Sequence, residues 1–105
     1  MDEVIKKIIE FRDERNWGQF HTPENLIKSI NIEAGELLEC VQWTNDLNIN
    51  NVKDELADVM NYCLLLCDKL NLNPEEIILD KEPQTTWGQR FMAGVYRWLP
   101  IRGQL

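Results

Sequence analysis

Two pairs of acidic residues stand at helical spacing in this chain, each within an apolar stretch. The first pair is Glu33 and Glu36, and the second is Glu55 and Asp58. At about 100° of turn per residue, residues three apart share one helix face. Carboxylates set among apolar side chains need cations, because removing an ion from water costs several kcal/mol. Mg²⁺ binds carboxylates together with substrate phosphates, so the pairs predict a metal centre that acts on a polyphosphate.

The apolar neighbours place one member of each pair toward the core. Within about 80° of Glu33 on a helical wheel lie Leu26, Ile30, Leu37, Cys40 and Val41. Within about 80° of Glu55 lie Val52, Val59, Tyr62, Cys63 and Leu66. We therefore expect Glu33 and Glu55 to face inward, with Glu36 and Asp58 at the rim. A single such pair usually marks a solvated helix face, but two in the same apolar register favour the metal site.

The helices that must position these acids carry recognisable start signals. Residues 2–15 have the periodicity of an amphipathic helix. Thr22 and Pro23 suit the cap and first turn of a second helix, which should run to about residue 42 or 43. Asn51 is the expected cap of a third helix that reaches about residue 70. Asn73 and Pro74 predict a short fourth helix that ends near residue 81.

The connector between the second and third helices is short, which favours an antiparallel hairpin. At about 1.5 Å per residue, this hairpin would put Glu36 and Asp58 nearly level. Leu64, Leu65 and Leu66 point about 100° apart, so their helix needs apolar cover on several sides. We predict an all-α fold, with a helical hairpin core, an N-terminal helix and a short fourth helix, completed as a helical bundle by oligomerisation.

Length and charge limit the possible classes of function. The 105 residues predict one domain over residues 1–81, followed by a tail over residues 82–105, because composition changes at Pro83. A net charge of −7 argues against binding a nucleic-acid polymer. The chain lacks an apolar run of about 18 residues and a signal-peptide pattern. We therefore expect a soluble, cytoplasmic protein that does not associate with membranes.

These residues resemble the all-α MazG-like nucleoside triphosphate pyrophosphohydrolases, and within them the dCTP pyrophosphatase branch. The likeness covers roughly residues 4–81. Its most specific part is E-x-x-E followed about 20 residues later by E-x-x-D, which here is formed by Glu33, Glu36, Glu55 and Asp58. The aromatic stretch over residues 11–26 (FRDERNWGQFHTPENL) and the V-Q-W at residues 41–43 support the branch.

The resemblance implies Mg²⁺-dependent cleavage of a (d)NTP between its α- and β-phosphates, with Mn²⁺ as an alternative ion. The substrate would be dCTP or a related deoxynucleotide, the products a monophosphate and pyrophosphate, and the role housecleaning of the nucleotide pool. The four acids would hold the metal, with a metal-bound water as nucleophile and one carboxylate as base. The family also implies a homo-oligomer, usually a tetramer built from dimers.

The same resemblance implies a set of substrate-binding residues. Trp17, Trp43 and Tyr62 match positions around the base and sugar, and Lys81 matches a lysine near the phosphates. His21 could bond a phosphate or the base. Each has a structural alternative: the aromatic residues as core fillers, His21 as a packed loop residue, and Lys81 as a complement to its helix dipole.

The chain departs from the family after Lys81, where E-P-Q-T-T replaces the segment that usually helps to close the phosphate site. The tail could substitute for that segment, cover a neighbouring subunit or be a mere extension. Two alternative functions stay open. One is a non-catalytic helical interaction module whose acidic pairs are ion-paired at an oligomer interface. The other is a membrane-surface helix over residues 87–99.

Overall fold

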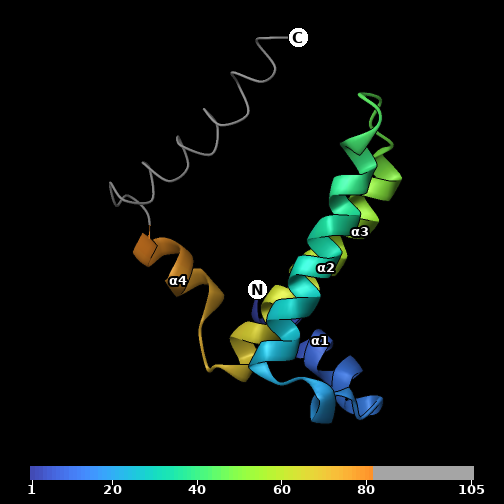
Figure 1. The fold of residues 1–105 in the computed structure, drawn as a ribbon. Coiled ribbons are helices and arrows are strands. Elements are labelled where there is room, and N and C mark those ends of the chain that lie inside the picture. The colour runs from blue at the N-terminus through green and yellow to red at the C-terminus, as the bar shows by residue number, and fades with distance from the viewer. Residues whose placement is uncertain (82–105) are drawn as a thin grey trace. The chain divides into compact units, whose positions relative to one another are not determined.

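Helices form nearly all of the described part of this protein, whose computed structural model describes residues 1–81. The α-helices are α1 (Asp2–Glu14), α2 (Pro23–Gln42), α3 (Ile49–Lys69) and α4 (Pro74–Lys81), with a 3₁₀ turn η1 (Trp17–Phe20) between α1 and α2 (Figure 1). The described residues contain no strand. The predicted all-α fold is therefore confirmed, while completion of the bundle by oligomerisation stays a prediction.

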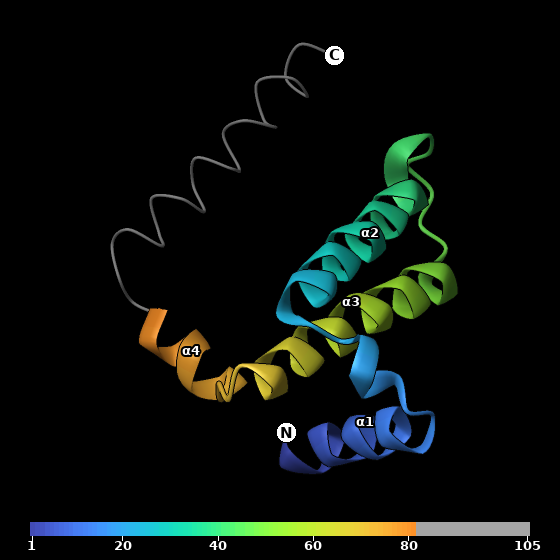
Figure 2. The ribbon, with the colours of Figure 1, turned by 60° about the horizontal axis from the view of Figure 1, so that its bottom comes forward.

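The core of the molecule is the antiparallel hairpin of α2 and α3, which lie side by side (Figures 1 and 2). Thr22 caps α2 as predicted, because the Asn25 backbone N–H donates to its hydroxyl at 3.1 Å and Pro23 occupies the first turn. The predicted cap of the next helix was wrong. Asn48, rather than Asn51, caps α3 and accepts from the N–H groups of Asn50 and Asn51.

Helix α1 packs against α3 and is joined to α2 through η1 (Figure 2). The chain leaves α1 at Asn16, which adopts the left-handed conformation with φ of 55°. Asparagine tolerates this region better than most residues, so it can end a helix where glycine is absent. The tight exit places Trp17 and Phe20 of η1, followed by His21, directly after α1.

The chain divides into two units, one spanning Met1–Leu72 and the other beginning at Asn73. The first unit ends in a Schellman motif around Asn71, in which the N–H of Leu72 donates to the Cys67 carbonyl at 2.8 Å. In the second unit, Asn73 caps α4 by accepting from the N–H groups of Glu75 and Glu76. The predicted tail over residues 82–105, with its suggested membrane-surface helix, lies outside the described residues.

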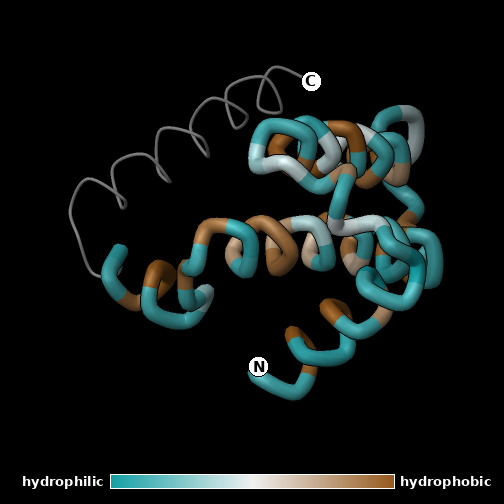
Figure 3. The backbone as a smooth tube through the Cα atoms, turned by 90° about the horizontal axis from the view of Figure 1, so that it is seen from below, coloured by the Kyte–Doolittle hydropathy of each residue, from teal (hydrophilic) through white to brown (hydrophobic). Residues whose placement is uncertain are grey.

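Apolar side chains are poorly covered in this single chain. Among the described residues, only Leu26, Leu65 and Cys67 form a buried apolar core. Hydrophobic and hydrophilic positions alternate along α1, α2 and α3 (Figure 3), as expected of amphipathic helices. Many large apolar side chains nevertheless stay exposed on the hairpin, including those of Ile27, Ile32, Leu38, Val41, Leu56 and Met60. In the described part of the chain, no helix is both long and apolar enough to cross a membrane.

Candidate active site

An acidic cluster forms where α2 and α3 face each other. Glu33 of α2 and Glu55 and Asp58 of α3 each offer a carboxylate oxygen, and these oxygens lie within 4.8 Å of one another. Glu33 and Glu55 are half-buried, whereas Asp58 is exposed. The antiparallel hairpin thus brings together acids that are more than twenty positions apart in the chain. We call Glu33, Glu55 and Asp58, together with the adjacent Glu36, the acidic cluster.

The electrostatics of this cluster are unfavourable without a cation. Burial raises the pKa of Glu33, and a hydrogen bond to the Glu36 carboxyl and the charges of Glu36, Asp58 and Glu55 raise it further. Burial likewise raises the pKa of Glu55, followed by a hydrogen bond to Glu36 and nearby negative charges. Glu36 is exposed at the rim of the hairpin. Each added carboxylate therefore makes ionisation of its neighbours harder.

Two buried carboxylate oxygens in the cluster have no hydrogen-bond partner and could coordinate a metal ion. Oε2 of Glu33 and Oε2 of Glu55 are both buried and accept no hydrogen bond. Buried polar atoms are nearly always paired, so these oxygens lack a positively charged or donating group. The ligand set consists only of carboxylate oxygens. Such a set suits hard cations such as Mg²⁺ or Mn²⁺ better than it suits zinc or copper. The cluster can therefore hold a divalent cation.

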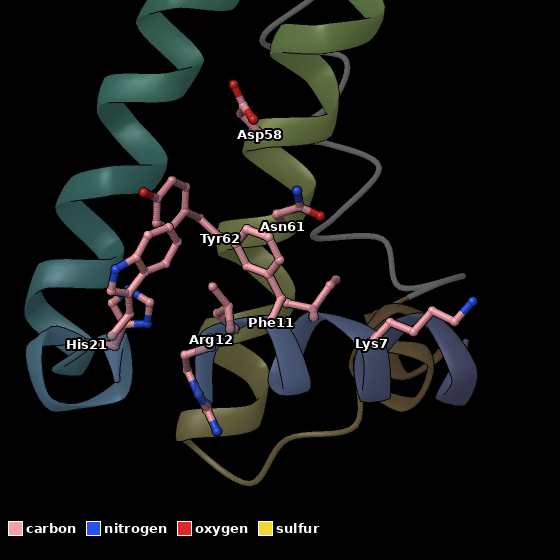
Figure 4. A pocket seen from close by; sticks show the side chains of 10 residues that line it. Lys7, Phe11, Arg12, His21, Asp58, Asn61 and Tyr62 are labelled. Carbon is pink, nitrogen blue, oxygen red and sulfur yellow. The ribbon is translucent and has the colours of Figure 1, made fainter. Parts of the chain in front are cut away.

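A pocket of about 420 Å³ opens beside the acidic cluster, formed by α1, η1 and α3 (Figure 4). Aromatic rings and the imidazole make up much of its wall, and Asp58 belongs both to this wall and to the acidic cluster. Its lining residues are Lys7, Ile8, Phe11, Arg12, Trp17, His21, Asp58, Asn61, Tyr62 and Leu65. This aromatic pocket is large enough for part of a small ligand, and such a ligand would extend toward the carboxylates.

His21 and Tyr62 meet edge to face in the wall of the pocket, with ring centroids 6.4 Å apart and ring planes at 72°. Burial lowers the pKa of His21, and the positive charges of Arg12 and Lys69 lower it further. The imidazole is therefore neutral near pH 7 and offers one donor and one acceptor. Its Nδ1 is buried and has no hydrogen-bond partner, so a polar group of a ligand could satisfy it.

The other end of the aromatic wall is a stacked arrangement around Phe11. The Phe11 and Trp17 rings meet edge to face at 5.5 Å, and the Arg15 guanidinium carbon lies 3.4 Å from the Phe11 ring centroid. Trp17 remains 44% exposed, which leaves ring surface for a ligand. The Arg15 Nη1 also donates to the Phe11 carbonyl at 3.2 Å, so a hydrogen bond and a cation–π contact together hold the guanidinium over the ring.

The structure brings together most of the residues selected from the sequence, but not all. Trp17, His21 and Tyr62 line the aromatic pocket, and the four acids lie together next to it. Trp43 does not line this pocket. It is 87% exposed and follows the C-terminal end of α2. At about 1.5 Å per residue, that end lies about 30 Å along the helix from Pro23 at the N-terminal end. Lys81 ends α4, which belongs to the second unit.

Several pocket residues were not selected from the sequence. Asn61, for example, lines the pocket with Asp58 and Tyr62. The spacing i, i+3, i+4 and i+7 over Asp58, Asn61, Tyr62 and Leu65 is a single helix face and could have identified it. Arg12 gave no such signal, because its contacts depend on how α1 meets α3.

Comparison with known proteins places the chain in a family. Residues 28–86 match the model of the MazG-like family. The sequence is 29% identical over 91 residues to dCTP pyrophosphatase 1 of Mus musculus and 30% identical over 91 residues to that of Homo sapiens. Each match covers 77% of this chain and 54% of the relative, so the chain spans about half the length of these curated relatives.

A solved structure agrees with the sequence matches. A pyrophosphatase from Archaeoglobus fulgidus superposes with a TM-score of 0.70 at 38% sequence identity. The match covers 95% of this chain and 92% of that protein. The resemblance inferred from the acidic motif is thereby confirmed, and the chain belongs to the MazG-like family.

Proposed function

We propose that this chain is a metal-dependent nucleoside triphosphate pyrophosphohydrolase that converts dCTP or a related deoxynucleotide to the monophosphate and pyrophosphate. The observation that carries the proposal is the pair of unpartnered buried oxygens of Glu33 and Glu55, which lie beside an aromatic pocket that shares Asp58 with them. The relatives are named dCTP pyrophosphatase 1 and pyrophosphatase. Site, neighbouring pocket and relatives all favour the same reaction.

In the proposed mechanism, Glu33, Glu36, Glu55 and Asp58 would hold Mg²⁺, with Mn²⁺ as an alternative ion. When bound, such an ion neutralises the phosphate charge and makes a coordinated water more acidic. The aromatic pocket binds the base and sugar between Trp17 and Tyr62, while neutral His21 donates or accepts one hydrogen bond. Because Asp58 joins pocket and cluster, a nucleoside seated in the pocket directs its phosphates toward the acids.

One acid of the cluster would accept the proton of the attacking water. A carboxylate oxygen that is not itself a metal ligand could take this proton. The reaction would then release pyrophosphate from the α-phosphorus.

The assembly is proposed to be a homo-oligomer, with a tetramer built from dimers as the family pattern. The exposed apolar side chains of α2 and α3 support this, because a second copy of the hairpin would cover them. Trp43 and Lys81 are kept as proposed substrate contacts, and an oligomer would allow them to reach a site in a neighbouring copy. A role in the nucleotide pool would place the protein in the cytoplasm.

The alternative of a non-catalytic interaction module needs cations to face the acidic cluster. Within the described residues, the ion pairs formed by Arg12 and Arg15 involve Asp13, Glu14 and Asp68 and none of the four acids. The alternative therefore needs cations from outside the described residues, as at an oligomer interface. The alternative predicts that Mg²⁺ leaves the melting temperature unchanged.

The test is a panel of common (d)NTPs incubated with purified protein, with and without Mg²⁺, with products separated by ion-exchange chromatography. The proposal predicts Mg²⁺-dependent formation of a nucleoside monophosphate and pyrophosphate, with dCTP among the best substrates. Absence of turnover across the whole panel would reject the enzymatic proposal. Turnover of another base would correct only the substrate.

A further inference from the structure

Arg12 forms the ion pair that joins α1 to α3. Its Nη1 donates to Oδ2 of Asp68 at 3.0 Å, and its Nε donates to Oδ1 of the adjacent Asp13 at 3.0 Å. The side chains of Arg12 and Asp68 are 16% and 33% exposed, whereas that of Asp13 is 62% exposed. Asp13 is the neighbour of Arg12 within α1, so only the bond to Asp68 links α1 to α3, and water screens this part-buried pair less than an exposed one.

The same guanidinium group supports η1, the turn that carries Trp17. A Cβ built on Gly18 would lie 3.5 Å from Nε of Arg12, so the backbone of η1 rests close to this side chain. The N–H of His21 in turn donates to the Gly18 carbonyl at 3.2 Å. Arg12 therefore contacts the segment that holds both Trp17 and His21 against the pocket.

Arg12 points away from the acidic cluster although it lines the pocket. In Figure 4 its guanidinium is directed away from Asp58, and it forms ion pairs with Asp13 and Asp68. Burial opposes its charge, but hydrogen bonds to Asp13 and Asp68 and their negative charges raise the pKa of Arg12 overall. With its Nε and Nη1 bonded to these acids and its guanidinium directed away from Asp58, Arg12 is better suited to hold the fold of the pocket than to bind phosphate.

We propose that Arg12 and Asp68 are positioning residues, whose ion pair holds α1 and η1 on α3 so that Trp17 and His21 stay opposite Tyr62. The kinetic part of this inference rests on the proposed function. Ordering a binding site before the ligand arrives reduces the entropy lost on binding. The pair therefore acts on nucleotide binding, while the chemistry at the acidic cluster proceeds at its usual rate once the substrate is seated.

The kinetic experiment compares Asp68→Asn and Arg12→Gln with Asp13→Asn as matched control. Asp13→Asn removes the exposed partner of the same guanidinium and should leave kcat and KM unchanged. Each of the other two variants should raise KM for dCTP about tenfold, equivalent to about 1.4 kcal/mol, with kcat within about twofold of wild type. The double variant Arg12→Gln/Asp68→Asn should be no worse than either single variant, because all three lose the same bond.

A measurement without substrate keeps the inference independent of the proposed activity. Hydrogen–deuterium exchange should become faster over residues 16–22 in Asp68→Asn and Arg12→Gln, while exchange in the α2–α3 hairpin stays slow. Asp13→Asn should match wild type. Unchanged exchange over residues 16–22, an unchanged KM, or a fall in kcat alone would overturn the positioning role. Faster exchange in a protein that hydrolyses no nucleotide would support the positioning role and reject the proposed function.

Discussion

Neutralising Glu33 should stabilise the metal-free protein while it removes the function. Glu33 offers an oxygen within 4.8 Å of those of Glu55 and Asp58. Two like charges at 4.8 Å repel by about 0.9 kcal/mol in bulk water and by about 3.5 kcal/mol at an effective dielectric constant of about 20. Because the site is open to solvent at Asp58, screening keeps the gain from Glu33→Gln near the lower value, at about 1 kcal/mol.

The assay is thermal unfolding of wild type and Glu33→Gln, in EDTA and across a Mg²⁺ series, together with pyrophosphate release from dCTP. In EDTA the variant should melt about 4 °C higher than wild type, since about 1 kcal/mol gives such a shift in a domain near this size. Mg²⁺ should raise the melting temperature of wild type, because a ligand that binds only the folded state stabilises it. The variant should respond weakly and release almost no pyrophosphate.

Glu10→Gln is the control for this experiment, because it makes the same substitution at an exposed acid of α1 outside the cluster. It should melt, respond to Mg²⁺ and turn over as wild type does. A Glu33→Gln variant that melts lower than wild type in EDTA would refute the claim of crowded, unrelieved charge. A variant with a full Mg²⁺ response would remove Glu33 from the metal site.

The remaining predictions concern pH, the pocket, the oligomer and the core. The pKa of Glu33 is raised in the folded protein, so as pH falls in EDTA the folded protein protonates Glu33 before the unfolded chain does. The stability advantage of Glu33→Gln over wild type should therefore shrink as pH falls from neutral toward 4.5. Urea titrations of both proteins at each pH measure this difference. Trp17→Ala should raise KM for dCTP about tenfold in steady-state kinetics, since stacking on a base contributes about 1–3 kcal/mol. Tyr62→Phe keeps the ring and should change KM less. Light scattering should give a mass of at least two chains, and Leu56→Glu, which places a charge on the exposed apolar face of α3, should lower it. Leu26→Ala, at a side chain that is 1% exposed, should cost about 3–5 kcal/mol of unfolding free energy in chemical denaturation.

Local signals in the sequence were sufficient to predict the helices. Thr22 and Pro23 began α2 as expected, because a cap and its first turn are specified by neighbours in the chain. The start of α3 was harder, since Asn48, Asn50 and Asn51 are chemically equivalent caps. Only the path of the connector out of α2 decides which of them meets the first free N–H groups, and this path is not a local property.

The candidate site followed from periodicity where its residues share helices, and escaped prediction where they do not. Wheel positions placed Glu33 and Glu55 inward, and the structure shows both half-buried in one cluster. The Arg12–Asp68 pair joins residues 56 positions apart, with no sequence pattern to link them. Trp43 shows the opposite case: the resemblance groups it with Trp17 and Tyr62, but α2 separates it from their pocket.

The central claim is that the acidic cluster drives cleavage at the α-phosphorus, and phosphorus NMR of dCTP hydrolysis in H₂¹⁸O tests it most directly. With Mg²⁺, the wild-type protein should convert dCTP to pyrophosphate and to dCMP that carries the ¹⁸O label, whereas Asp58→Asn should leave dCTP intact. Formation of dCDP and inorganic phosphate, label in pyrophosphate instead of dCMP, or undiminished turnover by Asp58→Asn would contradict the account.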